Sequence, residues 1–302
     1  MTEKRANIFL TIGGCMWGVY WIPLLHLEEL GLNGAASGTA LYSVSLLLLL
    51  PVIWRYRSIF ISQWRAFLFS GIMAGGAFSL YSTSLAYTDV IRCILLFYLT
   101  PVWGTIIGIL VLGEKLTLSR IAVIIIAFLG LFAVLGSGAS LPIPRNLGDV
   151  LALLSGILWA VGTLGLMQSK NVPAMPQIIA FLAGSLIISL ISIWLIGDMP
   201  DWQRTGENSY YMLGFLLIFA CLAIPMFWLT IAPAQVLTPA RVGILLMSEV
   251  VIGALSAALL SGQEFGMAEF IGTILIITAA LIEVFSQNPP LSSLENEEKR
   301  PL

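Results

Sequence analysis

The chain contains successive runs of about 20 apolar residues, separated by short polar or charged stretches. A helix needs about 20 such residues to cross a bilayer, where every backbone polar group must be bonded within the spanning structure. The sequence therefore predicts an all-α integral membrane protein with ten transmembrane helices. We place these spans near 7–27, 35–54, 66–88, 92–112, 120–137, 148–169, 176–197, 209–232, 241–261 and 267–286.

The composition excludes several other classes of protein. Charged residues make up only 10% of the chain, against roughly 25% in a soluble domain, and the net charge of −2 does not indicate a nucleic-acid partner. One histidine cannot form an HExxH metal motif, and the sequence has no Gly-Lys dipeptide for a phosphate-binding loop. We expect no metal, no cofactor and no enzyme activity.

The basic residues indicate how the chain enters the membrane. With the N-terminus in the cytoplasm, 11 of the 14 lysines and arginines fall on the inner side, including Arg55 and Arg57 in the loop expected after the second span. This asymmetry follows the positive-inside rule. We expect a multi-pass protein of the plasma (inner) membrane with both termini cytoplasmic, and a disordered cytoplasmic tail over 288–302 because that segment is polar.

The two halves of the sequence are related. A shift of 149 residues aligns the fourth and ninth spans and pairs Arg92 with Arg241, Gly104 with Gly253, Gly108 with Ala257 and Gly113 with Gly262. A shift of 142 pairs Trp17 with Trp159, both in mid-helix. Because each half holds five helices, the halves 1–140 and 141–287 would cross the membrane in opposite senses, as inverted repeats. Substrate sites in such architectures lie near the midplane, between the repeats.

Two short motifs indicate a family. The first half ends with FYLTPVW at 97–103 and LGEKLT at 112–117, which resemble the EamA repeat of the drug/metabolite transporter superfamily. The second copy is weaker: Ser248-Glu249-Val250 stands where the family often has Glu-Pro, and Gly262-Gln263-Glu264 where it has Gly-Glu. Gly31-Leu32 and ALYSVS at 40–45 are similar to the aromatic amino acid exporter branch. The resemblance implies a ten-helix transporter, often an exporter, of amino acids or related metabolites.

Glu249 is the ionisable residue placed deepest in a predicted span. A charge at the bilayer centre costs on the order of 3 kcal/mol, so this side chain should face a cavity or a partner. Its carboxyl group either binds a proton or substrate during transport, or only forms a hydrogen bond to a neighbouring helix.

Mid-span aromatic and proline residues are the other candidates for substrate binding. The aromatic candidates either line a pocket for an amphipathic solute or fill helix interfaces; they are Trp17, Tyr42, Tyr81, Tyr98, Trp103, Trp159 and Trp228. Pro101 and Pro225 lie mid-span, where a proline either frees a carbonyl group as a ligand or only kinks its helix for packing, and of the two we include Pro101 among the candidate site residues.

The favoured function is secondary transport, with export of amino acids or related small metabolites by alternating access around a central cavity. The partners would be a small-molecule substrate and the lipid bilayer, with protons as a candidate coupling ion. Two alternatives stay open. An intramembrane enzyme acting on a lipid-linked substrate would need a polar cluster, and a non-transporting scaffold would need no solute-sized cavity.

Overall fold

The computed structural model describes residues 1–32, 34–88, 90–135, 143–169, 171–197, 199–261 and 266–285, and these residues form helices and no strands. The predicted tail at 288–302 and the Gly262-Gln263-Glu264 motif lie outside this part of the chain. The helices are α1 (Glu3–Trp17), α2 (Trp21–Glu29), α3 (Gly34–Leu48), α4 (Leu50–Ser62), α5 (Trp64–Ser70), the π-helix η1 (Gly71–Gly75), α6 (Gly76–Ser84), α7 (Val90–Phe97), α8 (Thr100–Leu112), α9 (Leu118–Leu135), α10 (Leu147–Gln168), α11 (Ala174–Ile196), α12 (Trp202–Glu207), α13 (Ser209–Ala234), α14 (Pro239–Leu246), α15 (Ser248–Ser261) and α16 (Met267–Phe285).

The helices support an all-α membrane protein, with fewer clear spans than the ten predicted. Within the described residues, seven segments are long and apolar enough to cross a bilayer: Glu3–Glu29, Trp64–Ser84, Arg92–Leu112, Leu147–Gln168, Ala174–Ile196, Ser209–Ala234 and Pro239–Leu260. The pair α3 and α4 adds an eighth if it is one span, but the two helices meet at 81°. The two other predicted spans correspond to α9, whose apolar part Leu118–Val134 is shorter, and to α16.

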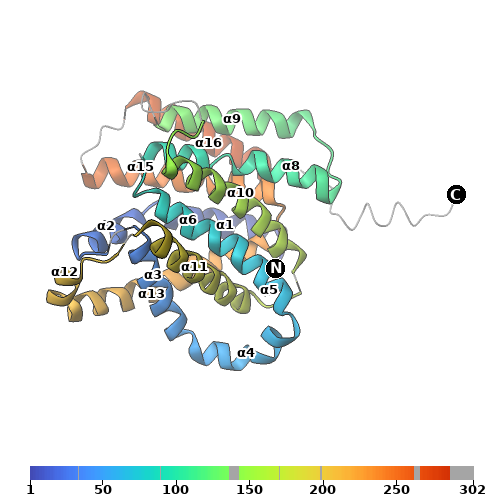
Figure 1. Cartoon of the computed structure of the whole chain (residues 1–302). Helices are drawn as coiled ribbons and strands as arrows, with labels where there is room; N and C mark the ends of the chain where they lie inside the picture. The colour runs from blue at the N-terminus through green and yellow to red at the C-terminus, as the bar shows by residue number, and fades with distance from the viewer. Residues whose placement is uncertain are drawn as a thin grey trace.

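The helices pack in a regular set of pairs (Figure 1). α9 and α16 lie along each other at one side of the bundle, and α8 packs on α14. In the rest of the bundle α10 contacts α6 and α7, α11 contacts α3 and η1, and α1 contacts α13, α14 and α15. Segments far apart in the sequence therefore form most of the interior.

Three of the candidate spans are broken in the middle. The helix pair α1 and α2 is interrupted at residues 18–20, α7 and α8 at Tyr98 and Leu99, and α14 and α15 at Met247. Pro101 lies in the first turn of α8, where proline disfavours helical geometry in the preceding residue and lacks an N–H to donate. Pro225, by contrast, lies inside α13, which continues to Ala234.

Glycines allow the closest helix contacts. A Cβ atom on Gly75 would lie 2.2 Å from the carbonyl oxygen of Phe181, and one on Gly18 would lie 2.7 Å from Cβ of Ile252. Small residues let helix backbones approach in this way, and the resulting van der Waals packing stabilises helix association in lipid.

The bundle also contains buried ion pairs. Arg92 Nη2 lies 2.5 Å from Asp149 Oδ2, which joins α7 to the first turn of α10. Arg120 lies 3.4 Å from Glu283 and joins α9 to α16. Buried charges are tolerated when they are paired in this manner, whereas removal of one partner is costly. Arg92, the first residue of the fourth predicted span, is therefore a buried residue held by an ion pair.

One predicted loop is wrong. Arg55 and Arg57 lie within α4 and not in a loop, because the apolar run continues past the bend at Leu49.

Candidate functional site

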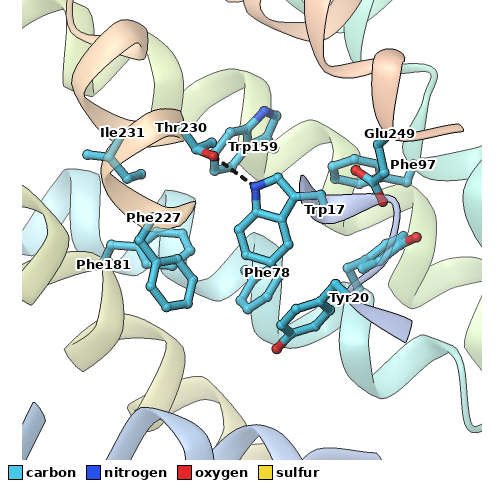
Figure 2. A pocket seen from close by; sticks show the side chains of 11 residues that line it. Trp17, Tyr20, Phe78, Phe97, Trp159, Phe181, Phe227, Thr230, Ile231 and Glu249 are labelled. Atoms are coloured by element: carbon cyan, nitrogen blue, oxygen red, sulfur yellow. Dashed lines mark hydrogen bonds between the residues drawn. The ribbon is translucent and has the colours of Figure 1, made fainter. Parts of the chain in front are cut away.

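A cavity lies where the broken helices meet, and aromatic side chains form most of its wall (Figure 2). Its volume is about 50 Å³, which is room for a few water molecules. The residues that line it are Trp17, Tyr20, Phe78, Tyr81, Phe97, Trp159, Phe181, Phe227, Thr230, Ile231 and Glu249. The cavity thus combines one carboxyl group with a largely aromatic surface.

Trp17, the last residue of α1, occupies the middle of the site. Figure 2 shows its indole between Glu249 on one side and Phe181 and Phe227 on the other. The indole Nε1 donates a hydrogen bond of 2.8 Å to Thr230 Oγ1 on α13. Its ring centroid lies 5.0 Å from that of Phe78 and 5.5 Å from that of Phe227, within the range of favourable aromatic pairs. These contacts fix the orientation of the ring.

Glu249 and Tyr98 connect the breaks of two helices. Tyr98 begins the break between α7 and α8, and Glu249 lies in the first turn of α15, just after the break at Met247. The Tyr98 hydroxyl lies 2.6 Å from Glu249 Oε2 and 3.0 Å from the carbonyl oxygen of Leu246. Glu249 therefore faces the cavity and a protein partner, not lipid.

Four of the nine predicted site residues line this cavity, namely Trp17, Tyr81, Trp159 and Glu249. Tyr98 reaches it through its hydrogen bond to Glu249. Trp159 differs from Trp17 in its polar contacts. Its buried Nε1 has no hydrogen-bond partner among the described residues, whereas that of Trp17 is bonded to a threonine.

The structure places the other four predicted residues outside the cavity wall. Tyr42 is fully buried behind the cavity wall, and its ring centroid lies 5.8 Å from that of Phe78. The ring centroid of Trp228 lies 5.6 Å from that of Phe9. Two more lie on α8 away from the cavity lining: Pro101, which packs against Gly243 of α14, and Trp103.

Several residues that line the cavity were not predicted from the sequence. Among aromatic residues only tryptophans and tyrosines were predicted to line a pocket, so the prediction omitted Phe78, Phe97, Phe181 and Phe227. Tyr20 of the first span was also omitted. The available signal was the presence of phenylalanine at mid-depth in several spans.

In the described part of the chain, no group of three or more His, Cys, Asp or Glu side chains could hold a metal ion. The residues that line the cavity offer one carboxyl group, two tyrosine hydroxyls, one threonine hydroxyl, two indole N–H groups and aromatic faces. Such a set suits reversible binding of an amphipathic molecule and proton exchange at a carboxyl group.

Comparisons with known proteins support this membrane architecture. No curated protein is significantly similar to the chain. Among solved structures 29 chains match, and one, described only as the crystal structure of a protein, has a TM-score of 0.69 at 14% identity, with 95% of this chain and 100% of that chain covered. That likeness establishes a shared fold. Residues 4–136, which include Trp17, Tyr81 and Tyr98, match the EamA-like transporter family.

Proposed function

We propose that this chain is a secondary transporter that moves small amphipathic metabolites, with amino acids as the leading class, by alternating access around the aromatic cavity. The observation that carries the proposal is the meeting of Glu249 and Tyr98 at the breaks of two helices beside that cavity. Discontinuous helices at corresponding places in two halves mark the substrate site in many carriers. The match of residues 4–136 to a transporter family agrees with it.

The proposal includes ten spans arranged as two inverted repeats, 1–140 and 141–287. Both bounds of α14 lie 149 residues after the corresponding bounds of α7, the shift that aligns the fourth and ninth spans in sequence. The helix contacts also correspond. Each span of one half can be exchanged for its counterpart in the other half. The contact of α1 with α13, in the first and eighth spans, then becomes the contact of α10 with α6, in the sixth and third spans. The contact of α9 with α16, in the fifth and tenth spans, maps onto itself. This regularity supports a duplicated bundle.

The hydrogen bonds at Tyr98 support proton binding by Glu249. A tyrosine hydroxyl has one hydrogen to donate, yet Tyr98 lies within bonding distance of both Glu249 and the carbonyl oxygen of Leu246. A protonated Glu249 can donate to Tyr98, which can then donate to Leu246, so that both contacts are satisfied. A charged Glu249 can only accept from Tyr98, and the bond to Leu246 is then lost. Proton binding therefore changes the contact between the two broken helices.

The cavity must enlarge to bind a solute. Its volume of about 50 Å³ is far below the roughly 300 Å³ at the lower end of ligand pockets. Trp159 provides one reason for it to open, because a buried N–H with no partner costs about 1–3 kcal/mol, and a solute oxygen could accept its hydrogen bond. The aromatic wall would bind the apolar part of the same molecule.

In the proposed orientation, both termini lie in the cytoplasm and the protein exports its substrate across the plasma (inner) membrane. This orientation is supported by the distribution of basic residues.

Counterflow in proteoliposomes tests the proposal. The purified chain is reconstituted with a panel of amino acids inside the vesicles, and exchange of each labelled amino acid is measured with and without an imposed pH gradient. We expect exchange of at least one amphipathic amino acid, with a pH dependence that Glu249→Gln abolishes. The matched control is Glu207→Gln, because Glu207 is an exposed carboxylate at the end of α12.

No exchange by the wild-type chain with any panel member would contradict the transport function. Exchange with an unchanged pH profile in Glu249→Gln would remove proton binding by this residue and leave transport intact.

The small cavity also favours a second candidate, a membrane scaffold that does not transport. A scaffold would keep the centre closed in every condition, whereas a carrier must expose it to water. Thiol labelling of the cavity wall from each side of the membrane distinguishes the two.

A further inference from the structure

The helix α4 turns sharply away from the direction of α3 and lies at the edge of the bundle. It meets α3 at 81° and has no buried residue, although the chain around it is apolar. Figure 1 shows α4 running below α11 before the chain returns to α5. Because a helix at right angles to a span cannot cross the bilayer with it, α4 has the orientation of a helix that lies along the membrane surface.

The side chains of α4 fit this position. Ile53 and Phe60 are partly buried toward the bundle, and the ring centroid of Phe60 lies 4.8 Å from that of Phe67 on α5. On the opposite face Trp54 is 70% and Ile61 75% exposed. An exposed tryptophan with aliphatic neighbours is typical of helices that insert one face at the boundary between headgroups and acyl chains.

The charge of this region has one sign. Arg55, Arg57 and Arg65 are all exposed, and the sequence has no acidic residue between Glu29 and Asp89. The Arg57 guanidinium lies 4.6 Å from the ring centroid of Trp54. Arg65 lies 5.4 Å from the ring of Trp64 in the same way. Arg57 Nη1 donates a 3.0 Å hydrogen bond to the carbonyl oxygen of Trp54, and its remaining N–H groups stay available for bonds to phosphate.

Beside α4 lies an apolar crevice of about 370 Å³, bounded by α4, α5, η1 and α11. Ile53 and Phe60 form one wall, Trp64 and Leu68 a second, and Ala183 lies on the third. Every residue in its lining is apolar, so the crevice offers nothing to a polar solute but matches a hydrocarbon chain.

We propose that α4 and this crevice form a binding site for an anionic phospholipid of the leaflet that α4 faces. An acyl chain fills the crevice, and the phosphate and charged headgroup bind Arg55, Arg57 and Arg65. The basic sign of the region selects an anionic over a zwitterionic lipid, and the apolar lining selects a lipid over a soluble phosphate. This site is separate from the aromatic cavity, which is lined by other residues.

Native mass spectrometry of the full chain in detergent tests the proposal. Binding of phosphatidylglycerol is compared with that of phosphatidylcholine carrying the same acyl chains. One arginine near a surface of anionic lipid contributes about a fivefold preference, so three predict more than a tenfold preference for phosphatidylglycerol. The triple variant R55Q/R57Q/R65Q should lose this preference.

A matched control removes the same charge elsewhere. Lys4, Arg5 and Lys115 are also exposed, and K4Q/R5Q/K115Q should keep the preference. Equal binding of the two lipids by the wild-type chain would overturn the proposal. So would a preference that survives in the α4 variant, or one that falls equally in the control variant.

The crevice is tested separately with Ala183→Phe, which fills it from α11. This variant should bind phosphatidylglycerol several-fold more weakly at an unchanged melting temperature. Unchanged binding would overturn the placement of the acyl chain in the crevice.

Discussion

The buried pair of Arg92 and Asp149 allows a quantitative test of the packing between α7 and α10. Asp149 is fully buried and accepts hydrogen bonds from the Arg92 guanidinium, the Thr88 hydroxyl and the backbone N–H of Arg145. Asp149→Asn keeps the size of the side chain and removes its charge. The arginine then stays buried without this carboxylate, a change that costs about 3–5 kcal/mol when one partner of a buried pair is removed.

The assay is thermal unfolding of the purified chain in detergent, followed by tryptophan fluorescence. At about 2–4 °C per kcal/mol, a figure for chains of 150–250 residues, Asp149→Asn should lower the melting temperature by at least about 6 °C. The control is Asp201→Asn. Asp201 lies 3.7 Å from Arg204 at an exposed site, where an ion pair contributes about 0–1 kcal/mol.

The double variant R92M/D149L separates an ion pair from a packing defect. Replacement of both charges by apolar side chains should recover most of the lost stability, because no charge then remains uncompensated. If the melting temperature of Asp149→Asn lies within about 1 °C of the wild-type value, the buried pair does not stabilise the chain as proposed. Equal destabilisation of the control variant would lead to the same conclusion.

Two further predictions concern packing and the site. Gly75→Ala should destabilise the chain by about 1–3 kcal/mol, because its Cβ would lie 2.2 Å from a backbone oxygen. The control is Gly214→Ala, whose Cβ meets nothing within 4 Å and which should be neutral or stabilising by up to about 1 kcal/mol. Equal melting temperatures of the two variants would contradict the close contact at Gly75. Tyr98→Phe removes the hydroxyl bonded to Glu249 and should slow amino acid exchange roughly tenfold and alter its pH dependence, whereas Tyr210→Phe, 93% exposed, should change neither.

The membrane class and part of the site could be predicted from sequence for simple physical reasons. Apolar runs of bilayer length have few other structural solutions, so the all-helical architecture follows from them. Glu249 stood out because an ionisable group is costly in lipid, and the structure places it against Tyr98 at the cavity. Trp17 and Trp159 stood out through their matched positions, and both line that cavity.

Other features depend on tertiary contacts and left no local signal. The bend between α3 and α4 lies within a continuous apolar run, so hydropathy gave no sign of it. The partner of Arg92 is Asp149, 57 residues later, and no short-range pattern links them. Met247 breaks a helix without a proline, and the phenylalanines of the cavity wall resemble any other apolar residue of a span.

Alternating access requires that the aromatic cavity becomes accessible to water from each side of the membrane in turn. The direct measurement places one cysteine at Ile231, which lines the cavity, in a chain from which Cys15, Cys93 and Cys221 have been removed. A membrane-impermeant maleimide is applied to proteoliposomes from either side, with and without a transported amino acid. The control is Ala223→Cys, on the same helix and as buried as Ile231 but outside the cavity lining. We predict that position 231 is labelled from both sides and protected by the amino acid, whereas position 223 is not labelled. If position 231 is not labelled from either side under any condition, the cavity does not open, alternating access is ruled out and a closed scaffold is favoured.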